Sequence, residues 1–177
     1  MQNSPHNRKS RIPALLPKAL LLISVIFWGG CVKYSFKGSL PSTIETIAIP
    51  LFQDRSREIG LLDKVYQATV NAFLSDNTLR VVEDPENADL VLQGTIQGVS
   101  EQRTAVNQQI TVEEYRLQVT LNMECIRTDL DKPLWKGAVS DYGSLPGTGD
   151  LAAREAALDE AVEKIVQEII TRTVAAW

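Results

Sequence analysis

Two pairs of acidic residues are the first candidates for chemistry in this sequence. Glu113 stands next to Glu114, and Asp129 is separated from Asp131 by one residue. Paired carboxylates can act as general acid and base, or they can bind a divalent cation. One pair falls at the start of an expected strand and the other in an expected hairpin turn, where solvated carboxylates are routine. We therefore expect no catalytic residue and no metal site here.

A glycine-rich segment, residues 143–149, precedes an expected helix. Helix N-termini bind anions, and glycine-rich loops in this position can cradle phosphates. No lysine follows the glycines, however, and Asp150 would repel a phosphate group. The segment is therefore not a P-loop. We expect it to be a plain loop, with no phosphate-bearing cofactor.

Histidine and cysteine usage narrows the function further. The only histidine is His6, which lies in a segment that we expect to be removed. Without an imidazole, the mature chain cannot use a Ser-His-Asp or Cys-His site or a histidine-ligated zinc. The two cysteines are Cys31 and Cys125, and a disulfide between them is one alternative. If Cys31 is modified, Cys125 remains as a lone buried thiol that behaves as a small apolar side chain. We expect no enzyme and no cofactor.

The N-terminus has the pattern of a secretory signal. Four basic and no acidic residues lie in 1–18, and ten residues, nearly all apolar, follow in 19–28. That run is too short to span a bilayer, which takes about 20 residues, but it is typical of a signal peptide. The next residues, Gly29-Gly30-Cys31, resemble a bacterial lipobox, although Trp28 stands where an aliphatic residue is usual. An ordinary signal peptide, or an uncleaved anchor with an incidental cysteine, is the alternative.

The lipobox interpretation sets the expected domain boundaries. Residues 1–30 are a lipoprotein signal peptide, 31–44 a lipidated tether and 45–177 a single folded domain. Two or three acyl chains on Cys31 would hold the protein on a membrane. Val32, rather than an aspartate, follows the cysteine. The inner-membrane retention signal is therefore missing, and we expect a lipid-anchored outer-membrane protein.

The charge of the mature chain argues against nucleic acid as a partner. The full chain has 18 basic and 22 acidic residues, and four of the basic ones lie in the leader. The remaining 14 basic and 22 acidic residues give a net charge of -8. Binding to a phosphate backbone requires a basic surface.

Apolar periodicity predicts the element order β-α-β-β-β-β-α. Alternation marks the strands and a spacing of three and four residues marks the helices. Gly94 and Gly98 are expected to form bulges or close approaches within one strand, and Asp150 is expected to cap the last helix. The predicted strands are 45–50, 79–82, 89–100, 114–125 and 134–142, and the helices carry apolar stripes over 62–74 and 158–174.

The clearest strand, 114–125, alternates perfectly between apolar and polar residues. Such alternation indicates a sheet with one buried face and one wet face, and it places Cys125 in the core. We therefore predict an α+β fold, a two-layer sandwich with two amphipathic helices on one face of a mostly antiparallel or mixed sheet. The wet face suits packing against the inside of another protein, although a solvated sheet face has the same pattern.

Five segments carry a resemblance to a known family: residues 34–41, 46–52, 72–82, 88–96 and 171–177. Together they resemble the LptE family of lipopolysaccharide-assembly lipoproteins, in its divergent branch. The resemblance covers nearly the whole mature chain in order. It implies an outer-membrane lipoprotein that acts as plug and assembly partner inside the LptD β-barrel, through which lipopolysaccharide reaches the outer leaflet.

The resemblance also implies contact with lipopolysaccharide through basic side chains, without assigning particular residues. The candidates are the basic residues of the expected hairpins, Arg103, Arg116, Arg127, Lys132 and Lys136. The alternative is a lipoprotein subunit of another envelope complex or of a self-assembling secretion channel.

Overall fold

The computed structural model describes residues 43–104, 114–146 and 150–175. These residues belong to the compact unit Lys37–Trp177. The predicted signal peptide, Cys31 and nearly all of the predicted tether lie outside the described residues, as do Glu113 and Trp177.

The described chain confirms the α+β class and the predicted element order. A two-residue strand, β2, and a single 3-10 turn, η1, are the additions. The elements are β1 (Thr46–Ala48), β2 (Gln53–Asp54), α2 (Leu61–Asp76), β3 (Arg80–Val82), η1 (Pro85–Asn87), β4 (Leu90–Thr104), β5 (Glu114–Arg127), β6 (Lys132–Pro146) and α3 (Leu151–Val174).

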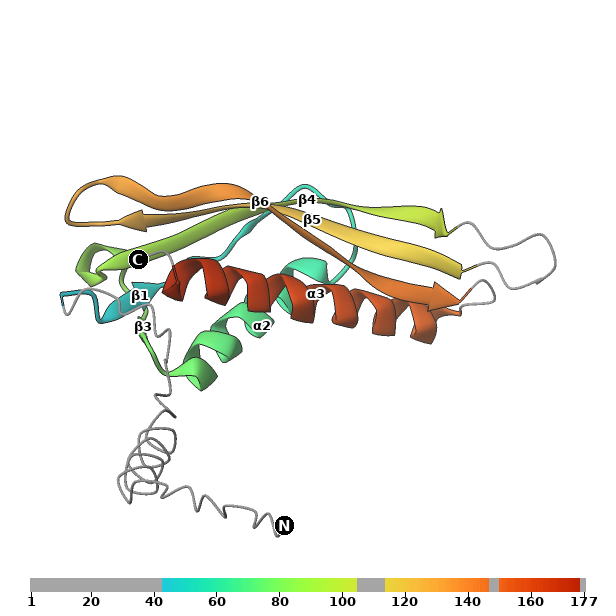
Figure 1. Cartoon of the computed structure of the whole chain (residues 1–177), viewed down its shortest axis with the longest axis horizontal. Coiled ribbons are helices and arrows are strands. Elements are labelled where there is room, and N and C mark those ends of the chain that lie inside the picture. Colours follow the sequence, from blue (N-terminus) through green and yellow to red (C-terminus); the bar gives the residue numbers. More distant parts are fainter. Residues whose placement is uncertain (1–42, 105–113, 147–149, 176–177) are drawn as a thin grey trace, which may run out of the picture. The chain divides into compact units, whose positions relative to one another are not determined.

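The strands form one mixed sheet in the order β3-β1-β4-β5-β6. β1 runs parallel to both β3 and β4, and β2 runs parallel to β4 further along the same edge. β4, β5 and β6 form an antiparallel meander of long strands. Both helices lie on one side of this sheet, with α3 alongside β6 (Figure 1). No helix of the described residues lies on the other side of the meander.

Alternation along β5 produces the two faces that the sequence predicts. Leu117, Val119, Leu121 and Met123 are at most 1% exposed, and Cys125 is fully buried. Burial raises the pKa of the Cys125 thiol to about 12, so the group stays protonated and unreactive at neutral pH. The prediction that Cys125 belongs to the core is confirmed.

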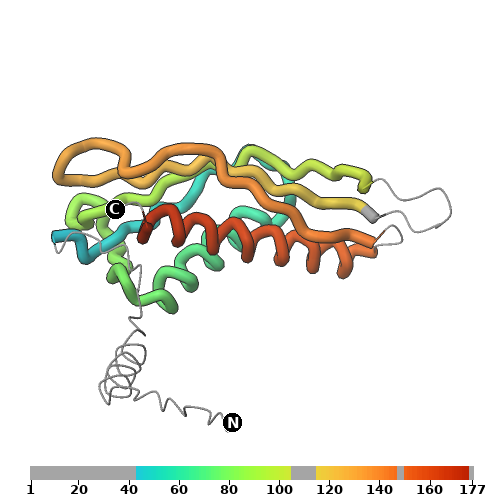
Figure 2. The backbone as a smooth tube through the Cα atoms, in the orientation of Figure 1, coloured from blue at the N-terminus to red at the C-terminus, as the bar shows by residue number. Residues whose placement is uncertain are grey.

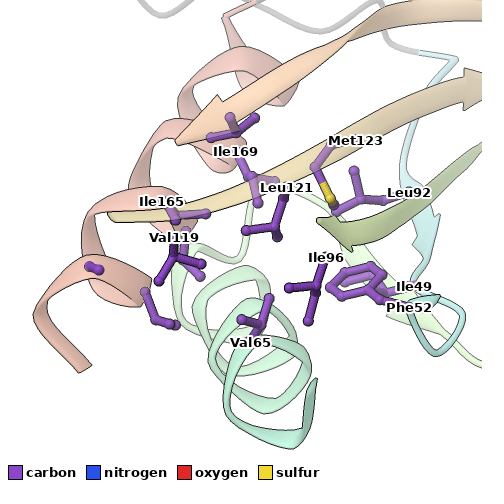
Figure 3. Packing of buried hydrophobic residues seen from close by; sticks show 14 of the residues in the cluster. Ile49, Phe52, Val65, Leu92, Ile96, Val119, Leu121, Met123, Ile165 and Ile169 are labelled. Atoms are coloured by element: carbon purple, nitrogen blue, oxygen red, sulfur yellow. The ribbon is translucent and has the colours of Figure 1, made fainter. Parts of the chain in front are cut away.

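The core lies between this buried face and the two helices (Figure 3). Val65 of α2 and Ile165 of α3 meet Leu121 and its neighbours from the sheet, and Phe52 closes the side beside Ile96. α2 buries every fourth residue, which is the spacing of a single helical stripe. Most of the predicted stripe of α3 is buried as well; its buried members are Leu158, Ala161, Val162, Ile165, Val166 and Ile169.

The start of α3 confirms one prediction and corrects another. The side chain of Asp150 caps the helix by accepting a hydrogen bond from the backbone N–H of Ala153 at 2.9 Å. Residues 143–146, however, are not loop, because β6 continues to Pro146. Gly143 lies directly under α3, where a methyl group would overlap the backbone of Ala157. Glycine is needed there for close packing of helix on strand, and that contact is not visible in the sequence.

The two glycines of β4 have different roles. The pairing with β5 shifts by one residue between Ile96 and Gly98, which is the bulge predicted at Gly98. Gly94 sits instead in regular pairing opposite Met123, whose side chain fills the space that a Cβ would occupy.

Candidate functional site

The face of β4, β5 and β6 that is turned away from the helices is polar, and we call it the outer face. Strand register decides its membership, because partners in neighbouring strands share a face. Two of its residues are basic and one is acidic. Its members are Gln93, Thr95, Ser100 and Gln102 on β4, Arg116, Gln118, Thr120, Asn122 and Glu124 on β5, and Lys136, Ala138, Ser140, Tyr142 and Ser144 on β6.

Side-chain hydrogen bonds connect the three strands across the outer face. Gln102 donates to Gln118 at 2.8 Å, and Gln118 donates to Ser140 at 3.4 Å. Towards the other end of the face, Lys136 forms an ion pair with Glu124 at 3.2 Å. These contacts hold amides and hydroxyls in place on a nearly neutral surface. Such a surface offers hydrogen-bond donors and acceptors to a polar partner without a strong electric field.

A hollow of about 560 Å³ lies at one end of the outer face. Its wall is the segment from Pro50 to Gln53, where Leu51 is 62% exposed, and its floor is formed by the three long strands. The volume lies within the ~300–1,000 Å³ range of small-ligand pockets. The lining mixes amides, the Lys136–Glu124 pair and aliphatic groups, so it does not by itself select one ligand.

Two cations contact the ring of Tyr142 at the β6 side of the outer face. The Arg116 guanidinium lies 4.4 Å from the ring centroid and the Lys164 ammonium 4.7 Å from it. Lys164 also donates to Glu160 at 2.8 Å. The hydrogen bond with Glu160 raises the pKa of Lys164, and the same bond, with the backbone N–H of Ser144, lowers the pKa of Glu160. Arg116 thus carries its charge on the outer face, while that of Lys164 is matched by a carboxylate.

Side chains of α3 bond to three of the outward-facing backbone groups of β6. Glu160 accepts from the N–H of Ser144 at 3.0 Å, Lys164 donates to the carbonyl of Tyr142 at 2.9 Å, and Arg172 donates to the carbonyl of Ala138 at 3.1 Å. Charged groups on an edge strand block the addition of another strand. Sequence reasoning missed this arrangement. The only signal was the helical i,i+4 spacing of Glu160 with Lys164 and of Glu168 with Arg172.

Arg154 connects three elements at the other end of the meander. It pairs with Glu58, in the loop before α2, at 2.9 Å, and with Glu101 of β4 at 3.6 Å. The hydrogen bond to Glu58 raises the pKa of Arg154. The start of α3 is thereby held against β4 and the loop that precedes α2.

Of the five predicted basic contacts, the structure places two on the outer face. Arg116 and Lys136 share this face, but Arg116 pairs with Ser144, eight residues along β6 from Lys136. At about 3.3 Å per residue, the two are roughly 26 Å apart along the strand. They cannot bind the same phosphate group.

The other three basic residues lie elsewhere. Arg103 is on the helix side of β4, with its guanidinium 5.8 Å from the ring of Tyr115. Arg127 binds Asp129 in the β5–β6 hairpin at 2.6 Å, and Lys132 is exposed at the start of β6. The fold therefore does not gather the five candidates into one basic site. The bond with Arg127 also lowers the pKa of Asp129, which commits one of the predicted acidic pair to an ion pair.

Within the described ranges, no group of three or more His, Cys, Asp or Glu side chains could hold a metal ion. None of the helices in that part of the chain is long and apolar enough to cross a membrane.

Comparison with known families identifies the class of protein. The family model LptE, described as lipopolysaccharide-assembly, matches residues 44–173. The match covers most of the chain, so the chain belongs to the LptE family of lipopolysaccharide-assembly proteins. No curated protein matches it significantly.

Solved structures show the same fold at low identity. The protein XCC0632 from Xanthomonas campestris is 12% identical, with a TM-score of 0.58, over 77% of this chain and 87% of that one. The hypothetical protein CT253 from Chlamydia trachomatis is 9% identical, with a TM-score of 0.56, over 75% of this chain and 97% of that one. These likenesses concern the fold alone.

Proposed function

We propose that this chain is a lipid-anchored outer-membrane protein that serves as plug and assembly partner of the LptD β-barrel in lipopolysaccharide transport. Membership of the LptE family supports a role in lipopolysaccharide assembly. The observation that carries the plug role is the outer face, a polar and nearly neutral surface spanning three long strands, which neither helix of the described chain covers.

The outer face is suited to the interior of a large barrel. Barrel interiors of outer-membrane proteins are polar, whereas their lipid-facing surfaces are apolar. Amides and hydroxyls such as those of Gln102, Gln118 and Ser140 can exchange hydrogen bonds with such a wall at little cost in desolvation. A strongly charged face would have to lose more hydration on docking. The surface chemistry therefore matches a protein host better than a membrane surface.

On the outer face, Arg116 and Lys136 are the basic residues that we assign to contact with lipopolysaccharide. Arg116 makes a ring contact with Tyr142 and keeps its guanidinium on the outer face, and Lys136 borders the hollow with a side chain 68% exposed. Arg127 is held by Asp129, and Arg103 faces the opposite side of the sheet. Lys132, the last of the five basic candidates, lies at the β5–β6 hairpin.

The role that we propose is not enzymatic. The mature chain that we infer has no histidine, because His6 precedes Cys31. The one described cysteine is buried, with a raised pKa, so it cannot act as a nucleophile at neutral pH. Binding and assembly then account for the function.

Purification from detergent-solubilised outer membranes tests this proposal. A C-terminal affinity tag on the full-length chain should recover a large β-barrel in about equal amount, and depletion of the chain should leave that barrel unassembled. A lone monomer would count against the proposal. A ring-shaped homo-oligomer in electron micrographs would favour a secretion-channel lipoprotein instead.

The lipid anchor is tested separately. Cys31→Ala removes the thiol that would carry the diacylglycerol. The variant should lose labelling by radioactive palmitate and accumulate with its leader uncleaved, whereas Cys125→Ala should keep both labelling and cleavage. Palmitate labelling that survives in Cys31→Ala would contradict the assignment.

A further inference from the structure

The distal part of β4 is an open strand edge. On this edge β4 pairs first with β1 and then with β2, both parallel to it. The last backbone hydrogen bond that the described chain makes to this edge is donated by the N–H of Arg55 to the carbonyl of Ile96, at 3.0 Å. From Gly98 to Thr104 no strand of the described chain pairs with this edge. In Figure 2 this part of β4 extends beyond the turn that leads from β2 into α2.

Strand register shows which backbone groups point out of the open edge. The carbonyl of Tyr142 is turned away from β5, since it accepts a hydrogen bond from α3. Its partner Gln118 must then direct its backbone groups to β4, where it pairs with Ser100. Ser100 therefore faces β5, and its neighbours Val99 and Glu101 present their N–H and C=O groups to the open edge. Two residues on, Arg103 does the same.

The opposite edge of the sheet provides the contrast. On β6 three of the outward backbone groups are bonded to Glu160, Lys164 and Arg172 from α3. On β4 Arg154 of α3 pairs with the side chain of Glu101. Within the described chain, charged side chains thus cover one edge of the meander, while no strand pairs with the other edge from Gly98 to Thr104.

The side chains of the open edge restrict what can pair with it. Glu101 and Arg103 both point to the helix side, since they pair with Leu117 and Tyr115 of the buried face. Ser100 and Gln102 point to the outer face. A matching strand would carry a basic side chain beside Glu101, an acidic one beside Arg103 and polar residues on the other side. Only an extended polypeptide offers N–H and C=O groups at the spacing of this edge.

We propose that an extended segment of the barrel partner adds to β4 along Gly98–Thr104 and continues the sheet. This inference rests on the proposed function, because that function supplies the partner. It goes further by naming one edge, one binding mode and the charge pattern of the segment.

Proline substitution separates backbone pairing from side-chain effects. Glu101→Pro removes the outward N–H while the β4–β5 ladder keeps its hydrogen bonds. Glu101→Gln removes the charge and keeps the N–H. Leu151→Pro is the proline control, because Leu151 is the exposed first residue of α3, where the N–H has no partner within the helix and proline is tolerated. Thermal unfolding establishes that each full-length variant is folded, and Arg103→Pro replaces Glu101→Pro if the latter is not.

The readout is the barrel recovered with each tagged variant from solubilised outer membranes. Glu101→Pro should reduce recovery by about tenfold, since it deletes one hydrogen bond and distorts its neighbours. Glu101→Gln and Leu151→Pro should stay within about twofold of the parent chain. In the intact complex, the outward amide hydrogens of Val99, Glu101 and Arg103 should exchange at least about tenfold more slowly than in the isolated domain.

The outcomes distinguish this inference from the proposed function. If the parent chain recovers no barrel, both fail. If it recovers the barrel, but Glu101→Pro behaves like Glu101→Gln and the amides of Val99, Glu101 and Arg103 gain no protection, only the strand addition is overturned. A dimer of the isolated domain in sedimentation that Glu101→Pro abolishes would assign the edge to a second copy and also overturn it.

Discussion

The two faces of the β4–β6 meander differ in what they contribute to the molecule. The helix-covered face is filled by aliphatic side chains such as Leu121 and Val139, which are at most 1% exposed. The outer face, one residue away along each strand, carries amides and hydroxyls that hydrogen-bond to one another at the surface. Burial of apolar area stabilises the fold, whereas exposed polar contacts contribute little net free energy.

The two faces of this sheet therefore have different roles: the covered face stabilises the fold, and the outer face is available for binding. The covered face cannot change without loss of stability. The outer face is free to change as far as folding is concerned, so we attribute its composition to binding. Substitutions at two neighbouring positions of one strand, one on each face, test that attribution directly.

The largest effect is expected from truncation in the covered face. Leu121→Ala should lower the free energy of unfolding by about 2–5 kcal/mol, because it leaves a cavity between the sheet and both helices. Urea denaturation of the folded domain measures it. Asn122→Ala, the next residue on the outer face, is the control and should change stability by no more than about 0.5 kcal/mol. Similar losses of unfolding free energy for both variants would contradict the assignment of stability to the covered face alone.

A smaller effect is expected where α3 touches the sheet. Gly143→Ala should destabilise the domain by about 1–3 kcal/mol, because the added methyl group meets the backbone of Ala157. Gly98→Ala is the matched control, since nothing lies within 4 Å of a Cβ at that position. Thermal unfolding of the two variants should show a clear fall in the midpoint for Gly143→Ala only. An unchanged midpoint there would mean that the helix does not pack so closely on β6.

A polar network at the start of the sheet should give a pH-dependent contribution. One carboxylate oxygen of Asp89 accepts from the backbone N–H groups of Glu45 and Thr46 and from the Thr46 hydroxyl. The Glu45 bond is the main cause of the lowered pKa of Asp89. Because the folded pKa lies below the ordinary value of 3.8, the contribution is complete above that value and is lost as the pH falls through the folded pKa.

Asp89→Ala should therefore cost about 1–2 kcal/mol near neutral pH. The difference from the parent chain should shrink as the pH is lowered from about 5 to about 2. Urea midpoints of both proteins across this range measure it. A constant difference would show that the charge of Asp89 is not what the network stabilises.

The smallest effect on stability is expected at the centre of the outer face. Thr120→Trp should leave the free energy of unfolding within about 0.5 kcal/mol, since the side chain points away from the core. Its bulk should nevertheless reduce the recovery of the barrel partner by about tenfold, because docked faces pack closely. Arg57→Trp, on an exposed loop, is the control and should leave recovery unchanged. Full recovery of the barrel with Thr120→Trp would show that the outer face does not contact the barrel partner.

Local patterns in the sequence were enough to predict most of the elements. Alternation over 114–125 predicted β5 and the burial of Cys125, and the stripe over 158–174 predicted α3 with its cap at Asp150. These signals are local because a strand or helix repeats within a few residues, and because a cap bonds within one turn. They also predicted the two layers, since both helices and the sheet had one apolar face to bury.

The sequence did not reveal how separate elements meet. The pairing of β2 with β4, the extension of β6 past Gly143 and the separation of Arg116 from Lys136 depend on register and packing between distant segments. The protected edge of β6 and the open edge of β4 depend on where α3 docks. Periodicity fixes which side of an element is apolar, but long-range packing decides which neighbours it meets, and so which polar groups remain available for a partner.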